Sequence, residues 1–329
     1  MSSSRGMLGY VLAKLLHRLA TLIFIMALIY VLMRLAPGTP FDQYLAMGKL
    51  TKEQYEYLLM KWGYKDNILV GLGKVIYGMF TLSLFKMNSP VWNQPILELV
   101  TTRLINTLGL IISAYLLGSM LGMLLGLYTA RKHGTGSEAA ILWGALVYRS
   151  LPVFWLGMIF LYFLSYIGGF FPFTATSEIS PSNIFHYVVD WFWHSILPLI
   201  CLSKLAAVGY LFTIRNMIMD EMSNDYVTTL RAVGYSEHMI LERYVMRHIM
   251  PPVITMMAID IGFLFGGAVV TETVFNYPGM GRLIYDAIWS KDYPVVLAAF
   301  YIVALAVIIS VTIAEIMYAY LDPRIRTAR

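Results

Sequence analysis

The sequence alternates between long apolar runs and shorter polar segments. Six apolar runs cover residues 19–33, 104–130, 139–168, 191–214, 253–275 and 295–320. A helix needs about 20 apolar residues to cross about 30 Å of hydrocarbon, and the first run reaches this length with the amphipathic residues before it. The pattern predicts an all-α polytopic membrane protein with six transmembrane helices.

The short segments between these runs predict the orientation. Basic residues gather before the first run, between the second and third, between the fourth and fifth, and after the sixth: Arg5, Lys14, Arg18, Arg131, Lys132, Arg215, Arg231, Arg243, Arg247, Arg324, Arg326 and Arg329. Short basic loops stay on the cytoplasmic side. We therefore expect a multi-pass protein of the cell membrane, with both termini and the 215–252 loop in the cytoplasm.

The same pattern divides the chain into four parts. Residues 1–38 form the N-terminal tail and first helix, and residues 39–95 form a polar region that we expect to fold outside the membrane. Residues 96–320 form the transmembrane core, and residues 321–329 form a cytoplasmic tail. Thr51, with Gln54 three residues later, predicts a capped helix in the outer region.

Composition agrees with this class and narrows the chemistry. The 329 residues are 59% hydrophobic and only 13% charged, with a mean hydropathy of +0.68, whereas soluble proteins have about 25% charged residues. The net charge of +5 is spread over short loops, so it predicts orientation rather than nucleic-acid binding. A lone cysteine, Cys201, excludes a disulfide framework and a thiolate metal cluster within one chain.

Motifs for catalysis are absent from the sequence. The string G-x-x-x-x-G-K-[ST] of a phosphate-binding loop does not occur, and the six histidines lack the paired spacing of metal ligands on a helix. No serine-centred nucleophile motif is present either. We therefore expect no enzymatic activity, no catalytic residue, no metal site and no cofactor in this chain.

The stretch 225–252 is the longest polar segment of the C-terminal half. It is interpreted as two short helices broken at Gly234, because glycine adopts positive φ without steric cost, with Ser236 as the cap of the second helix. Short side chains on the first helix would let another backbone approach closely. Pro251 and Pro252 are expected to open the next apolar helix.

This stretch resembles the "EAA" loop of ABC importer permeases, and especially of the dipeptide and oligopeptide family. The stretches RLAPGTP (34–40), VVTETVFNYPGMGRLIYDAI (269–288) and LDPRIR (321–326) resemble the same family, so the likeness covers nearly the whole chain. The sequence departs from the family motif at its Glu-Ala-Ala positions, which hold Thr228, Thr229 and Leu230.

The resemblance implies half of a transport pathway for peptides or a related solute. It implies a second homologous permease subunit, two ATPase subunits that bind ATP and magnesium, and an extracytoplasmic solute-binding protein. The implied ATPase-docking residues are Thr228, Thr229, Leu230, Arg231, Ala232, Val233, Gly234, Tyr235 and Ser236. Relatives of this family carry peptides, oligosaccharides or nickel, and the sequence does not choose among them.

Two functional alternatives remain at this point. A secondary transporter would operate without ATP, and it would show inverted repeats with paired broken helices, which are not evident in the sequence. An integral-membrane enzyme would need clustered His, Asp or Glu at one membrane depth, and none is evident.

Three of the charged residues within the apolar runs are candidate functional residues. Lys204 and Asp260 are predicted at similar depths of adjacent spans, so they either form an ion pair or face the pathway separately. Glu272 is predicted near the outer gate. It either faces substrate or, as we favour, accepts hydrogen bonds from backbone N–H groups of the following Pro-Gly loop.

Overall fold

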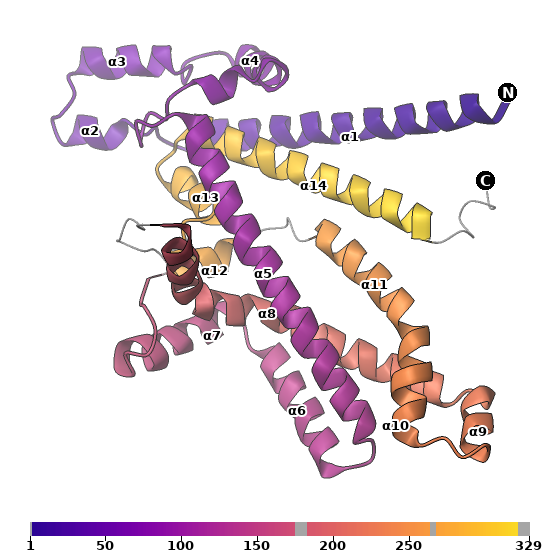
Figure 1. The fold of residues 1–329 in the computed structure, drawn as a ribbon. Coiled ribbons are helices and arrows are strands. Elements are labelled where there is room, and N and C mark those ends of the chain that lie inside the picture. The colour runs from indigo at the N-terminus through magenta and orange to yellow at the C-terminus, as the bar shows by residue number, and fades with distance from the viewer. Residues whose placement is uncertain (1, 175–182, 264–267, 322–329) are drawn as a thin grey trace. The chain divides into compact units, whose positions relative to one another are not determined.

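We analysed a computed structural model of the chain, which describes residues 2–174, 183–263 and 268–321. Helices make up the secondary structure of this part, and it contains no β-strand beyond one isolated bridge, Asn88 to Pro95. Contacts divide the chain into two compact units, Met1–Asn106 with Gly279–Ile309 and Thr107–Pro278 with Ser310–Arg329. Figure 1 shows the helices.

The first unit contains the N-terminal helix and the outer region. Its elements are α1 (Ser2–Leu35), α2 (Asp42–Ala46), α3 (Lys52–Lys61), α4 (Ile68–Thr81), the short helix η1 (Ser83–Lys86), the start of α5 (Ile96–Arg131), α13 (Met280–Trp289) and the first part of α14 (Tyr293–Leu321). The predicted cap is confirmed, because Thr51 and Gln54 form a reciprocal capping box at α3.

Residues 39–95 are fixed to the rest of the first unit through partly or fully buried polar contacts. The Arg34 guanidinium, near the end of α1, donates to the carbonyl oxygens of Gly63, Tyr64 and Asp66. The fully buried Asp292 accepts from the Ser89 hydroxyl and from the backbone N–H of Val295. These contacts satisfy loop carbonyls and a helix N-terminus that would otherwise lack partners.

The second unit contains the rest of the core. Its elements are the remainder of α5, α6 (Gly136–Ser150), α7 (Val153–Phe160), the π-helical η2 (Leu161–Ile167), α8 (Ile184–Met222), α9 (Asp225–Ala232), α10 (Glu237–Met239), the π-helical η3 (Ile240–Val245), α11 (Met246–Phe263), α12 (Val269–Val274) and the end of α14.

Four helices of the described part are long and apolar enough to span a membrane, and a fifth candidate is the bent pair α6 and α7. The protein is therefore an all-α polytopic membrane protein. The four helices coincide with the predicted first, second, fourth and sixth runs. The predicted fifth run, 253–275, begins in α11 and ends in α12, with residues 264–267 outside the described part.

The predicted third span is not one straight helix. Its two halves, α6 with its continuation α7–η2, meet at an angle of 99°. The cause is local, because Leu151 precedes Pro152 and the proline ring disfavours the α conformation there. Leu151 accordingly has an extended backbone, with φ −68° and ψ 130°.

The prediction that Pro251 and Pro252 open a helix was wrong. Both lie inside α11, which begins at Met246 as a direct continuation of η3. The helix therefore begins before the apolar run does, because the polar loop supplies its first turn.

Helices α5 and α8 approach each other along three glycines of α5. A Cβ on Gly118 would lie 2.3 Å from the carbonyl oxygen of Ser203, and one on Gly122 would lie 2.4 Å from that of Ala207. One on Gly126 would lie 2.8 Å from the Leu211 oxygen. We call these glycines the glycine seam. Small residues at every fourth position allow this backbone contact, which is the usual way that helices pack in lipid.

We predict that Gly122→Ala destabilises the protein. The new methyl group would overlap the Ala207 carbonyl, and overpacking of this kind costs about 1–3 kcal/mol. Thermal unfolding of the purified protein in detergent should show a lower Tm. Gly209→Ala in α8 is the matched control, because nothing lies within 4 Å of its added methyl group; equal Tm values for the two variants would contradict the seam.

Candidate functional site

The polar loop 223–245 leaves α8 and returns into α11 through two short helices. Gly234 has φ +94°, so it turns the chain as predicted. The Ser236 hydroxyl accepts from the N–H of Met239, which confirms its predicted capping role. Val227 and Ile240 are fully buried in a cluster with Ile218 of α8. The loop is therefore a folded structure fixed to the end of α8.

The nine predicted docking residues form one surface at the tip of this loop. All are exposed except Leu230, which is half-buried against the apolar cluster. Val233 is 70% exposed although it is apolar. A Cβ on Gly234 would meet no atom within 4 Å. The tip thus exposes the apolar side chain of Val233 beside a turn that has free space around it.

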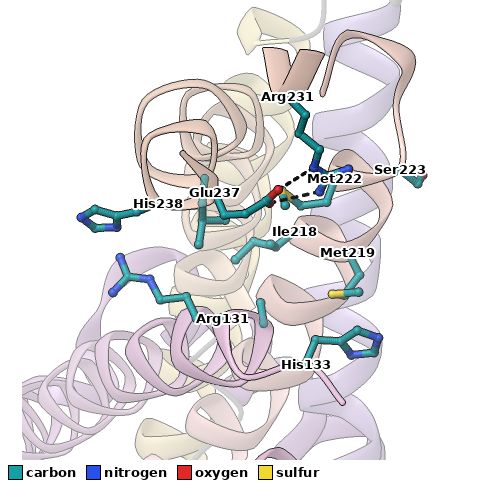
Figure 2. A pocket seen from close by; sticks show the side chains of 11 residues that line it. Arg131, His133, Ile218, Met219, Met222, Ser223, Arg231, Glu237 and His238 are labelled. Atoms are coloured by element: carbon teal, nitrogen blue, oxygen red, sulfur yellow. Dashed lines mark hydrogen bonds and ion pairs between the residues drawn. The ribbon is translucent and has the colours of Figure 1, made fainter. Parts of the chain in front are cut away.

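A groove of about 590 Å³ lies beside this tip (Figure 2). Its apolar wall comes mainly from the ends of α5 and α8, and its polar rim from α9 and α10. The lining residues are Ala130, Arg131, His133, Ile218, Met219, Met222, Ser223, Arg231, Glu237, His238 and Leu241.

Ion pairs on the rim fix the loop. The Arg231 guanidinium holds the Glu237 carboxylate through two hydrogen bonds, Nε to Oε1 at 2.6 Å and Nη2 to Oε2 at 3.1 Å (Figure 2). These bonds hold the pKa of Glu237 below its ordinary value. The Arg131 guanidinium pairs with Glu242 of η3. Both arginines of the groove are therefore already neutralised by acids of the loop.

Lys204 is 1% exposed within α8. Its ammonium donates to the carbonyl oxygen of Leu151 and lies 5.7 Å from the centre of the Tyr148 ring. The Leu151 carbonyl belongs to the break before Pro152, where the helical hydrogen-bond ladder is interrupted. Lys204 thus supplies a donor to a break inside an apolar region, where an unsatisfied carbonyl is costly.

Asp260 of α11 has a different set of partners. Its Oδ2 accepts from the Tyr210 hydroxyl at 2.8 Å and from the Tyr115 hydroxyl at 3.2 Å. The two hydroxyl oxygens lie 2.6 Å apart. This hydroxyl–carboxylate cluster joins α5, α8 and α11.

The predicted Lys204–Asp260 ion pair does not form in this structure. Lys204 is directed to the junction of α6 and α7, whereas Asp260 is held by the two tyrosines. The carbonyl at the helix break accepts from Lys204, and the two tyrosine hydroxyls donate to Asp260. The structure thus disfavours the pair, and because Lys204 is buried it does not support a pathway-facing position for that residue either.

Glu272 lies in α12 and is fully buried. Its Oε1 accepts from the Thr107 hydroxyl of α5 at 2.6 Å, and its backbone carbonyl accepts from the N–H of Tyr277 at 2.8 Å. Burial favours the structural alternative over the substrate-facing one. The direct role in the Pro-Gly loop stays a prediction.

Sequence reasoning missed the polar partners of these charges. Tyr115, Tyr148 and Tyr210 lie within apolar runs, where an aromatic residue is easily attributed to packing. The Tyr115 and Tyr210 hydroxyls bind Asp260 and the Tyr148 ring lies near Lys204, and the sequence pattern carried no signal that singled out these tyrosines.

Comparison with known proteins decides the family. Residues 118–327 match the family of the binding-protein-dependent transport system inner membrane component. The chain is 32% identical over 324 residues to the oligopeptide transport system permease protein AppB of Bacillus subtilis, covering 97% of this chain and 99% of AppB. It is 30% identical over 325 residues to the glutathione transport system permease protein GsiC of Salmonella choleraesuis, covering 97% and 99%. The chain belongs to this family.

The protein is thus a permease subunit of an ABC importer in the plasma membrane. Members of this family are permease components rather than the ATPase that hydrolyses ATP. Membership makes the secondary-transporter alternative unnecessary, because other components of the transporter supply the energy.

We predict that Lys204→Met and Asp260→Leu destabilise the permease independently. The first leaves the Leu151 carbonyl without a donor, which costs about 1–3 kcal/mol, and the second leaves the tyrosine pair without its acceptor. Because the two residues share no partner, the losses should add. Tm values of both single variants and of the double variant test this. A double variant that is more stable than either single variant would contradict this prediction and support an ion pair between Lys204 and Asp260.

Proposed function

We propose that this permease forms half of a pathway for peptides across the cell membrane. The second half would be a homologous permease subunit, since one chain supplies few candidate spans. Two ATPase subunits would bind on the cytoplasmic side and hold ATP and magnesium. A solute-binding protein would deliver substrate outside. The names of the relatives support peptides as the substrate class, because they specify oligopeptides and glutathione, itself a short peptide.

The observation that carries the coupling role is the shape of the polar loop. Its tip exposes Val233 and leaves free space at Gly234, while its base is buried against α8. A partner that grips the tip would therefore pull on α8 rather than merely bend a flexible loop. Exposed apolar side chains at such a place favour a protein partner.

Two ion pairs connect the polar loop within itself and to α5, so that movement of the loop would be passed to the membrane helices. Arg231 and Glu237 hold α9 against α10, and Arg131 with Glu242 ties the end of α5 to η3. Each exposed pair contributes little alone, about 0–1 kcal/mol. Together with the buried apolar residues they oblige α5, α8 and the loop to move as one body. In the assembled importer, ATP-driven movement of the ATPases would reach the membrane helices this way.

We predict that Gly234→Glu uncouples ATP hydrolysis from transport. The side chain would project into the space where the ATPase surface is expected and would carry a charge into a packed contact. Substrate-stimulated ATPase activity of the co-purified, reconstituted importer should fall severalfold while membrane levels stay normal.

Gly234→Ala is the matched control for this experiment. It imposes the same strain of a side chain at positive φ, but without bulk or charge. Stimulation in Gly234→Glu equal to that in Gly234→Ala would show that the tip is not the ATPase contact.

Substrate class is tested on the solute-binding protein that co-purifies with this permease. Calorimetric titration with a panel of di- to hexapeptides and a panel of oligosaccharides should give micromolar or tighter binding for peptides only. Binding restricted to the sugars would overturn the proposed substrate while leaving the ATP-driven mechanism intact.

A further inference from the structure

Helix α4 packs directly on the membrane-spanning part of α1. Met79 of α4 shares a buried cluster with Leu22, Met26 and Tyr30 of α1. Gly71 lies so close to α1 that an added Cβ would come 1.8 Å from the Tyr30 hydroxyl oxygen. Figure 1 shows α4 beside the C-terminal half of α1. The contact is therefore made by the helix body of α1 and not by the loop that follows it.

The position of this contact along α1 gives its depth. The candidate span of α1 is Leu16–Leu35. Tyr30 lies about 8 Å of helix before Leu35, and Met26 lies about 14 Å before Leu35, at about 1.5 Å per residue. Helices that lie in the membrane interface insert to about 5–10 Å. The contact with Tyr30 lies within this range, and the contact with Met26 reaches further into the membrane.

The outward face of α4 is apolar. Leu69, Tyr77 and Phe80 share this face at helical spacing and are 76%, 68% and 61% exposed. Gly73 lies between them with open space around it. By contrast, the neighbouring α3 carries Lys52, Glu53, Glu56 and Lys61, as a helix in water does.

The polar residues of α4 lie to one flank. Lys74 and Thr81 lie between the buried face of Gly71 and Gly78 and the apolar face. The Lys74 ammonium pairs with Asp66 at 2.6 Å. A lysine at the edge of an apolar face can extend its charge toward the headgroups while its carbon chain stays in the apolar layer. The flank and the apolar face together have the distribution of an interfacial helix.

We propose that α4 is an interfacial helix embedded in the membrane leaflet at the C-terminal end of α1, with Leu69, Tyr77 and Phe80 against lipid acyl chains. Depth selects lipid as the occupant, because the face lies beside a span rather than beyond it. Phe24, Leu28 and Leu32 of α1 are likewise exposed and apolar. The sequence predicted that residues 39–95 fold outside the membrane. In this proposal part of that segment, α4, returns into it.

The test uses nitroxide spin labels on single cysteines. The only native cysteine, Cys201, is buried and is replaced by alanine. Cysteines are introduced at Leu69 and Phe80 on α4, at Tyr57 on α3 as the water-exposed control, and at Phe24 on α1 as the lipid-exposed control. Each full-length variant, with the transporter components that co-purify, is reconstituted in vesicles of phosphatidylethanolamine and phosphatidylglycerol.

Collision rates with oxygen, which enters lipid, and with a water-soluble nickel chelate are then compared. Labels at Leu69 and Phe80 should show the high oxygen-to-nickel ratio of the Phe24 label and not the low ratio of the Tyr57 label. A ratio like that at Tyr57 would place α4 in water and overturn the proposal. Exclusion of both reagents would mean that protein covers the face, and it would overturn the proposal as well.

Discussion

Backbone contact between α5 and α8 is the constraint on which the second unit depends. Lipid offers no hydrophobic force to hold two apolar helices together, so their stability comes from close packing. The glycine seam provides it over two turns. Because the two helices are fixed there, Tyr115 and Tyr210 can meet at Asp260, and Arg131 comes within reach of Glu242. The groove beside the loop tip has its walls from the same two helices.

Three charges inside this unit are each satisfied by an uncharged partner: Lys204 by the carbonyl at a proline break, Asp260 by two hydroxyls, and Glu272 by Thr107. Burial of a charge in an apolar region requires such partners. These uncharged contacts offset the cost of burial, so Lys204 and Asp260 need no ion pair with each other.

Much of the fold was predictable from the sequence, since four apolar runs match four long helices, and Gly234 and Ser236 have the predicted local roles. The bend in the third run was not predicted, because apolar length does not reveal the break that Pro152 imposes. The start of the fifth helix was predicted too late, because the polar loop supplies the first turn of α11. The ion pair failed for another reason. Depth along a helix is readable from sequence, whereas the direction of Lys204 depends on a helix break far away in the chain.

The two ends of helix α8 differ in their backbone hydrogen bonding. It contacts the glycine seam at Ser203, Ala207 and Leu211, and from there to Met222 it contains no proline. On the other side of the seam it contains Pro198, which removes a hydrogen bond from the ladder. A force applied at the polar loop would therefore arrive at the seam through a stiff rod of about 16 Å, at about 1.5 Å per residue. Beyond the seam the same helix lacks one hydrogen bond of its ladder, so α8 has its unbroken segment toward the loop and its weakened segment toward Ile184.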